Sequence, residues 1–238
     1  MNFRNVLLGT MLVTFFACGT EKLSPSKLFV KEMGDPTYYK DVFDYNDGHL
    51  ISFKRFFGTR EETNTQFYYL NNLLVKVEVK KDQGLEFTVE LKNGENALRK
   101  EEKLTMIYNG DTTYIRTGNF IYVGNALKSI TYSYNDPANY PTSEIDFGWA
   151  DGNITRIDNY SYDSFGRRYN GYSTYVYDNK LNYSNQDIAF IYTVGTGDET
   201  KVSKNNQGGS DYKYLYNDKG YPIEYTHLKL DHVILKYE

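Results

Sequence analysis

Apolar and polar residues alternate along most of the chain from Tyr38 onward, in short runs that end at turn-forming residues. Residues 75–80 place a valine at every second position between charged side chains, and residues 87–91 repeat the pattern with Phe, Val and Leu. Successive side chains of a β-strand point to opposite faces of a sheet, so each run predicts a strand with one apolar face. No helical period of comparable strength is present. The charged stretch 96–103 fits either one helical turn or the start of a strand.

Turns separate these runs and give the chain the pattern of consecutive hairpins. Asn, Asp and Gly accept the positive φ that tight turns require. The predicted turns are Asn46-Asp47-Gly48, Asn71-Asn72, 82–84, Asn93-Gly94, Asn109-Gly110, Asp151-Gly152, Asp178-Asn179 and Asp218-Lys219-Gly220. The expected fold class is therefore all-β. We predict a large antiparallel meander of hairpins in a single domain, either a curled sheet or an open barrel-like or sandwich arrangement.

Two features of the composition modify this picture. Tyrosine occurs 25 times against one Trp, at every second position in runs such as 132–134 and 212–216. A tyrosine ring can pack across a strand pair while its hydroxyl stays in water, so a tyrosine-rich sheet is stable when it is only thinly covered. The segment 200–211 has almost no apolar residue and contains two adjacent glycines. It predicts a long mobile loop, either disordered or acting as a lid.

The amino-terminal residues follow a different pattern. Arg4 is the only early charge, and a mostly apolar run follows it to Ala17. That run has the length of the apolar part of a signal peptide and is too short to span a bilayer. It ends at Phe15-Phe16-Ala17-Cys18-Gly19, which resembles the lipobox of bacterial lipoproteins. The resemblance implies that residues 1–17 are a signal peptide and that Cys18 is lipidated, which anchors the protein to a membrane. Residues 18–30 would form a tether, and residues 31–238 the folded domain.

Charge and cysteine content exclude some partners and crosslinks. The chain has 27 basic and 31 acidic residues, for a net charge of −4, and removal of residues 1–17 would take away one further base. Nucleic-acid binding draws on clustered Lys and Arg, whereas the bases here are interspersed with acids, so no nucleic acid is expected as a partner. Cys18 is the only cysteine. We therefore expect packing alone, without an intramolecular disulfide, to hold the fold.

Several turns share a Tyr-Asp type of motif. Tyr45-Asn46-Asp47-Gly48, the unit Tyr162 to Arg167 and the unit Tyr216 to Gly220 resemble tyrosine-aspartate (YD) repeats, and Tyr177-Asp178-Asn179 is a partial copy. Together with Trp149 to Ile154 and the lipobox, these units resemble an uncharacterised family of outer-membrane lipoproteins from Bacteroidota-type bacteria with irregular YD-repeat-like hairpins. The resemblance implies an all-β domain and a cell-envelope location. It brings no activity and no binding residues.

No catalytic, metal or cofactor motif stands out. His49, His227 and His232 form no zinc motif, and in one continuous strand His227 and His232 would face opposite sides, so we interpret all three as solvent-facing. Gly171 to Tyr175 begins like the turn that carries a catalytic serine, but Tyr175 replaces the second glycine and no helix follows. We predict no catalytic residue, no metal site and no cofactor.

Two acidic groups provide weaker alternatives. Glu144 and Asp146 would share one strand face roughly 6.5–7 Å apart, within the separation used by inverting glycosidases, although an acid-rich sequence produces such pairs by chance. Asp44, Asn46 and Asp47 offer oxygen ligands for calcium, but their spacing departs from calcium loops and turns need the same residues.

The candidate ligand-binding residues are aromatic, because Tyr and Trp rings stack on sugar rings or partner side chains with little loss of entropy. They are Trp149, Tyr160, Tyr162, Tyr172 and Tyr175, each of which sheet packing would also explain. The sequence favours a non-enzymatic, lipid-anchored binding module of the outer membrane, facing the periplasm or the cell surface, with a glycan or an envelope protein as ligand. The alternatives are a glycan-active enzyme that uses a carboxylate pair, and a structural or adhesive envelope component with a free edge strand.

Overall fold

The structure of the chain is a computed structural model that describes residues 28–35, 37–94, 97–163, 165–182, 188–192, 203–209, 212–227 and 231–237. Its strands are β1 (Val30–Gly34), β2 (Tyr39–Asn46), β3 (His49–Phe57), β4 (Arg60–Leu70), β5 (Leu73–Lys81), β6 (Leu85–Asn93), β7 (Arg99–Tyr108), β8 (Asp111–Val123), β9 (Ala126–Tyr134), β10 (Ser143–Ala150), β11 (Asn153–Asp163), β12 (Gly166–Thr174), β13 (Tyr177–Leu181), β14 (Asn205–Gln207), β15 (Tyr212–Tyr216), β16 (Pro222–His227) and β17 (Asp231–Tyr237). Two short 3-10 helices, η1 (Asp82–Gly84) and η4 (Ile188–Tyr192), complete the described elements.

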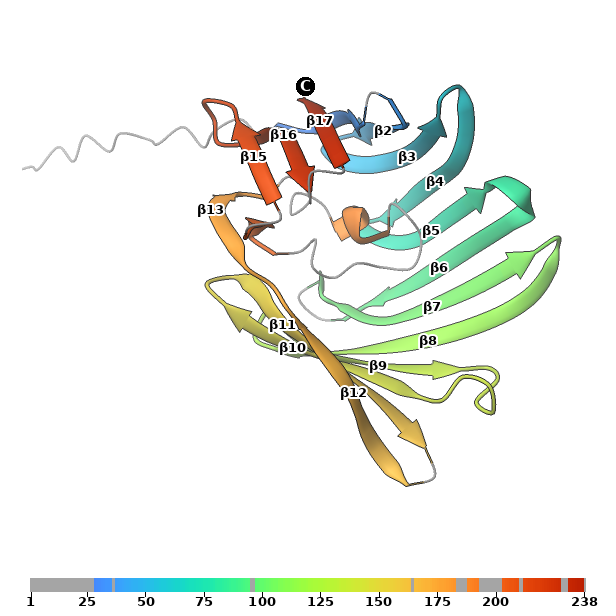
Figure 1. Cartoon of the computed structure of the whole chain (residues 1–238). Coiled ribbons are helices and arrows are strands. Elements are labelled where there is room, and N and C mark those ends of the chain that lie inside the picture. The colour runs from blue at the N-terminus through green and yellow to red at the C-terminus, as the bar shows by residue number, and fades with distance from the viewer. Residues whose placement is uncertain are drawn as a thin grey trace, which may run out of the picture.

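Fifteen of these strands form one antiparallel sheet (Figure 1). Strands β1 to β12 follow one another as a meander, and β15 to β17 extend the same sheet beyond β1, where β17 pairs with β1. The sheet curls without closing, because β12 and β15 lie at its two edges. Strands β13 and β14 pair separately. The prediction of an all-β, single-domain antiparallel meander is confirmed.

The alternation of the sequence produces two chemically different faces. Val77, Val89 and Leu104 are neighbours in register on β5, β6 and β7, and all three are buried. We call their side of the sheet the inner face; the buried residues of η4 pack in the same core, and Figure 1 shows η4 inside the curl. Lys76 and Glu90 pair with each other next to the Val77–Val89 pair, and they point to the opposite face, which we call the outer face.

The inner face carries two apolar cores. The first joins β1 to β7, β17 and η4, and the second joins β8 to β11 around Phe120, Ile130 and Phe147. Gly118 of β8 lies against Tyr132 of the second core. A Cβ at this position would stand 2.8 Å from the ring of Tyr132. Glycine is therefore required here because a buried ring occupies the space of a side chain.

A charged cluster on the inner face holds η4 against the sheet. Glu102 of β7 is 1% exposed and accepts hydrogen bonds from Arg116 of β8 (2.8 Å) and from the hydroxyl of Tyr192 in η4 (2.8 Å). Arg99 lies 3.4 Å from the same carboxylate. Burial disfavours the charged form of Arg116, but Tyr132 and Glu102 outweigh it and raise the pKa of the guanidinium. The cluster thus joins residues that lie about 90 positions apart in the sequence.

Most of the predicted turns are hairpin turns of the sheet, with two corrections. Asp178-Asn179 is not a turn but lies within β13, where Asp178 accepts hydrogen bonds from the amide of Lys180 and from the hydroxyl of Tyr216. The segment 200–211 is not a loop throughout, because β14 forms within it and Ser203 and Asn206 are buried. The charged stretch 96–103 is mainly the start of β7.

The expected signal peptide, Cys18 and most of the tether lie outside the described residues. In the part of the chain that the structure describes, none of the helices has the length and apolar character needed to cross a membrane.

Candidate functional site

Charged and aromatic side chains gather on the outer face of β10, β11 and β12. The strand register places Glu144, Tyr160 and Tyr169 side by side in one row across the three strands. The next row on the same face contains Asp146, Asp158 and Tyr172. We call this surface the outer patch. Its residues are Glu144, Asp146, Arg156, Asp158, Tyr160, Tyr162, Arg167, Tyr169 and Tyr172.

Arg167 organises one half of the outer patch. Its guanidinium lies 3.0 Å from Glu144 and 2.8 Å from Asp146, and 3.4 Å from the centre of the Tyr160 ring. The hydroxyl of Tyr162 also donates a hydrogen bond to Glu144. Partial burial opposes ionisation of Glu144, but the bonds from Tyr162 and Arg167 outweigh it and lower the pKa of this carboxyl. A single guanidinium therefore fixes two carboxylates and one ring.

Arg156 organises the other half. It forms two parallel hydrogen bonds to Asp158, of 2.8 and 2.6 Å, and its guanidinium lies 4.3 Å from the centre of the Tyr172 ring. The hydrogen bonds from Arg156 lower the pKa of Asp158. Tyr172 and Tyr169 are nevertheless 59% and 48% exposed. Because bidentate Arg–carboxylate pairs restrict side-chain motion, the patch presents two accessible rings among charged groups that are already positioned.

This arrangement suits binding better than acid catalysis. An inverting glycosidase needs one carboxyl that stays protonated through a raised pKa. Glu144 and Asp146 share an ion pair with Arg167 instead, and the pKa of Glu144 is lowered. The carboxylate pair considered from the sequence therefore lacks the electrostatic environment of a general acid.

The predicted aromatic residues divide between the two faces. Tyr160, Tyr162 and Tyr172 meet in the outer patch. Trp149 does not: its indole N–H donates to the carbonyl of Leu127 (2.7 Å) and it packs against the second core on the inner face. Tyr175 follows the end of β12 and is half-buried.

Four residues of the outer patch were not predicted as site residues from the sequence: Arg156, Asp158, Arg167 and Tyr169. Arg167 had a usable signal, because the turn unit Tyr162 to Arg167 is a hairpin motif whose ends pair directly. Tyr169 had none, because a register shift between Asn159 and Tyr160 decides that it faces Tyr160.

The other residues considered for chemistry have structural roles. Two of the three histidines interpreted as solvent-facing are half-buried against aromatic rings: His49 packs on Tyr69 and His227 on Tyr212, with ring centres 4.6 and 4.5 Å apart. His232 is exposed and lies 3.0 Å from Glu224.

The residues considered as a catalytic-serine turn and as calcium ligands belong to strands of the sheet or to the turns beside them. Gly171 to Thr174 belong to β12, and Asp44 accepts a hydrogen bond from Ser52. Among the described residues, no group of three or more His, Cys, Asp or Glu side chains is placed to hold a metal ion.

Comparison with known proteins shows a likeness of fold. The sequence matches no protein-family model, and no curated protein is similar to it. A porin-like protein from Bacteroides vulgatus ATCC 8482 has a similar structure, with a TM-score of 0.51 and 14% sequence identity over 88% of this chain and 98% of that one. A porin-like protein from Bacteroides uniformis ATCC 8492 gives a TM-score of 0.45 and 14% identity over 89% and 95% of the two chains. At 14% identity, the likeness to the Bacteroides vulgatus protein shows a similar fold.

Proposed function

We propose that this protein is a lipid-anchored binding protein of the bacterial outer membrane and that its outer patch binds carbohydrate. The observation that carries the binding role is the pair of exposed rings, Tyr169 and Tyr172, held beside Arg–carboxylate pairs. Aromatic rings stack on the C–H faces of sugars, and the flanking charged groups supply hydrogen-bond donors and acceptors for sugar hydroxyls. A site that is ordered before the ligand arrives loses less entropy on binding.

Two observations support the envelope location. Residues 1–19 have the pattern of a signal peptide followed by a lipobox. The structure of similar fold comes from a Bacteroides protein described as porin-like. Both agree with a protein that is exported and held at a membrane.

The charges of the outer face support a domain that stands in water beside the membrane. Lys76 and Glu78 lie on this face of β5, and Lys92 of β6 pairs there with Glu101 of β7 at 2.5 Å. A basic side chain facing the middle of a bilayer costs about 2–4 kcal/mol. A face with this many charges is therefore better suited to water than to lipid.

A glycan array probed with the mature protein tests the binding role. We expect binding to a defined set of glycans, and we expect the double variant Tyr169→Ala/Tyr172→Ala to lose roughly tenfold or more in affinity, since each stacked ring contributes on the order of 1 kcal/mol. Tyr68→Ala is the matched control. Tyr68 is also exposed and lies beside an ion pair, with its hydroxyl 2.7 Å from Glu78 and its ring 5.5 Å from the Lys76 ammonium. An array without binding, or equal affinity of the double variant and wild type, would refute the proposal.

A further inference from the structure

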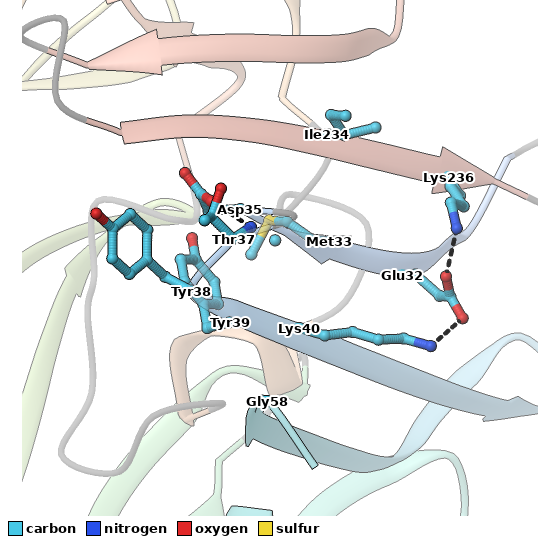
Figure 2. Close-up of a pocket in the computed structure, with 11 residues that line it drawn as sticks. Glu32, Met33, Asp35, Thr37, Tyr38, Tyr39, Lys40, Gly58, Ile234 and Lys236 are labelled. Carbon is cyan, nitrogen blue, oxygen red and sulfur yellow. Dashed lines mark hydrogen bonds and ion pairs between the residues drawn. The ribbon is translucent and has the colours of Figure 1, made fainter. Parts of the chain in front are cut away.

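A cavity of about 440 Å³ lies at the end of the hairpin formed by β1 and β2, beside β17 and several strands away from the outer patch (Figure 2). Gly34 and Gly58 line part of it without side chains. A Cβ on Gly34 would stand 2.2 Å from the carbonyl oxygen of Tyr39, so no other residue fits at this position. The volume of the cavity falls in the range of small-ligand sites.

One end of the cavity carries two positioned ammonium groups. Lys40, Glu32 and Lys236 come from the adjacent strands β2, β1 and β17 (Figure 2). Each lysine contacts a different oxygen of Glu32, at 2.6 Å for Lys40 and 2.8 Å for Lys236. The hydrogen bonds from Lys236 and Lys40 lower the pKa of Glu32. The three groups together carry one positive charge, and each ammonium has three N–H donors, of which Glu32 uses one.

The other acid in the lining serves the hairpin turn. Asp35 is buried, and its side-chain oxygen accepts the amide hydrogen of Thr37 at 2.7 Å. This backbone hydrogen bond is the main reason that the pKa of Asp35 is lowered. The charged groups that are placed to meet a ligand are therefore the two lysines, and an anion is the ligand group that they favour.

The remaining lining is apolar and aromatic. Ile234 and Met33 line the cavity between the lysine pair and the Tyr38 ring in Figure 2. Tyr38 is 68% exposed, which leaves its ring accessible to a ligand. A ligand that meets the lysine pair and the neighbouring apolar lining needs an anionic group joined to a compact ring with C–H surface.

We infer that this cavity is a second binding site, separate from the outer patch, that takes an acidic sugar: a pyranose bearing a carboxylate or a sulfate. The anionic group lies at Lys40 and Lys236, and the C–H face of the ring lies toward Ile234. The need for an anion rests on the lysine pair alone, whereas the choice of a sugar ring rests on the proposed carbohydrate-binding function.

The test compares small ligands by NMR titration of the mature protein. Methyl glucuronide and methyl glucoside 6-sulfate are the anionic probes, methyl glucoside is the neutral match, and benzoate is an anion with a different ring. We expect at least one anionic sugar to bind roughly tenfold or more tightly than the neutral glucoside, to shift the amide resonances of Gly34 and Gly58, and to weaken as salt is raised. The sugar that binds distinguishes carboxylate from sulfate.

Two variants locate the site. Lys40→Met/Lys236→Met should abolish the preference for the anionic sugar, whereas Lys76→Met/Lys92→Met removes the same charge from exposed ion pairs elsewhere and should retain it. All four lysines are well exposed, so both variants should fold, which a thermal melt verifies.

Three results would overturn the inference: equal binding of neutral and anionic glucosides, an anion preference that survives in Lys40→Met/Lys236→Met, or benzoate binding as tightly as the sugars. The variant Tyr169→Ala/Tyr172→Ala separates the two proposals. It should keep acidic-sugar binding at the cavity, so loss of array binding in that variant reports on the outer patch alone.

Discussion

Glu102 places an acidic side chain on an otherwise apolar face, which costs free energy unless partners compensate. The compensation comes from Arg116, Arg99 and the hydroxyl of Tyr192, with the guanidinium of Arg99 also 3.8 Å from the centre of the Phe120 ring. These residues belong to β7, β8 and η4. A single carboxylate therefore holds the sheet and the segment inside the curl together.

Replacing this carboxylate by an amide should be strongly destabilising. Glu102→Gln keeps the shape but leaves two largely buried guanidinium groups without their anion, and breaking a buried ion pair in this way costs about 3–5 kcal/mol. Urea unfolding followed by circular dichroism measures the loss. Glu78→Gln is the control, since its pair with Lys76 is partly exposed and such pairs contribute about 0–1 kcal/mol. Equal midpoints for the two variants would contradict this account of the cluster.

At the scale of elements, the local pattern determines most of the sheet. Alternation predicts strands such as β5 and β6, and Asn–Gly or Asp–Gly pairs predict the turns between them, because both depend on residues close in sequence. The outer patch was predicted only in part. Trp149 was a candidate ligand-binding residue together with Tyr160, although the alternation with Asp146 places the indole on the other face. Tyr169 was missed because a bulge, which no local signal marks, sets its register.

Strand β14 lies beyond local prediction because its stability comes from distant polar groups. The amide side chain of Asn153 donates to the side chain of Asn205 (3.0 Å) and accepts from its backbone N–H (2.8 Å). Ser203 accepts a hydrogen bond from the N–H of Ile154 (3.0 Å). The segment has few apolar residues of its own, so composition alone indicated a loop. Hydrogen bonds to residues about 50 positions earlier fix it instead.

Removing one of these groups should loosen β14 without unfolding the sheet. In Asn153→Ala the partners on Asn205 lose their bonds in a buried site, which costs about 1–3 kcal/mol. We expect hydrogen exchange at 203–207 to accelerate markedly while exchange in β5 and β6 changes little. Asn170→Ala, at an exposed position on β12, should leave both regions unchanged. Uniform acceleration over the whole sheet would show that β14 is not a separate unit.

At the scale of the whole molecule, the two ends of the described chain meet in one place. Strand β1 pairs with β17, so the segment that precedes Val30 leaves the domain beside its last strand. The 12 Cα–Cα steps from Cys18 to Val30 span at most roughly 40 Å when the chain is fully extended. A lipid on Cys18 would then let the domain stand clear of the headgroups with both proposed binding surfaces accessible to ligands in water.

The proposed lipid anchor gives a prediction with a definite readout. When the chain is produced with its own first 17 residues in a Gram-negative host, we expect mass spectrometry to find an amino-terminal peptide that begins at Cys18 and carries acyl chains. Several acyl chains bury enough methylenes, at about 0.8 kcal/mol each, to make membrane attachment stable.

Cys18→Ser should abolish incorporation of labelled palmitate, because its hydroxyl cannot replace the thiol that receives the lipid. Ser24→Ala, within the same tether, should incorporate label as the wild type does. Two outcomes would contradict the anchor: a mature protein that starts elsewhere, or one that starts at Cys18 without acyl chains. Either would indicate export by ordinary secretion. The length calculated for the tether would then say nothing about where the protein meets its ligands.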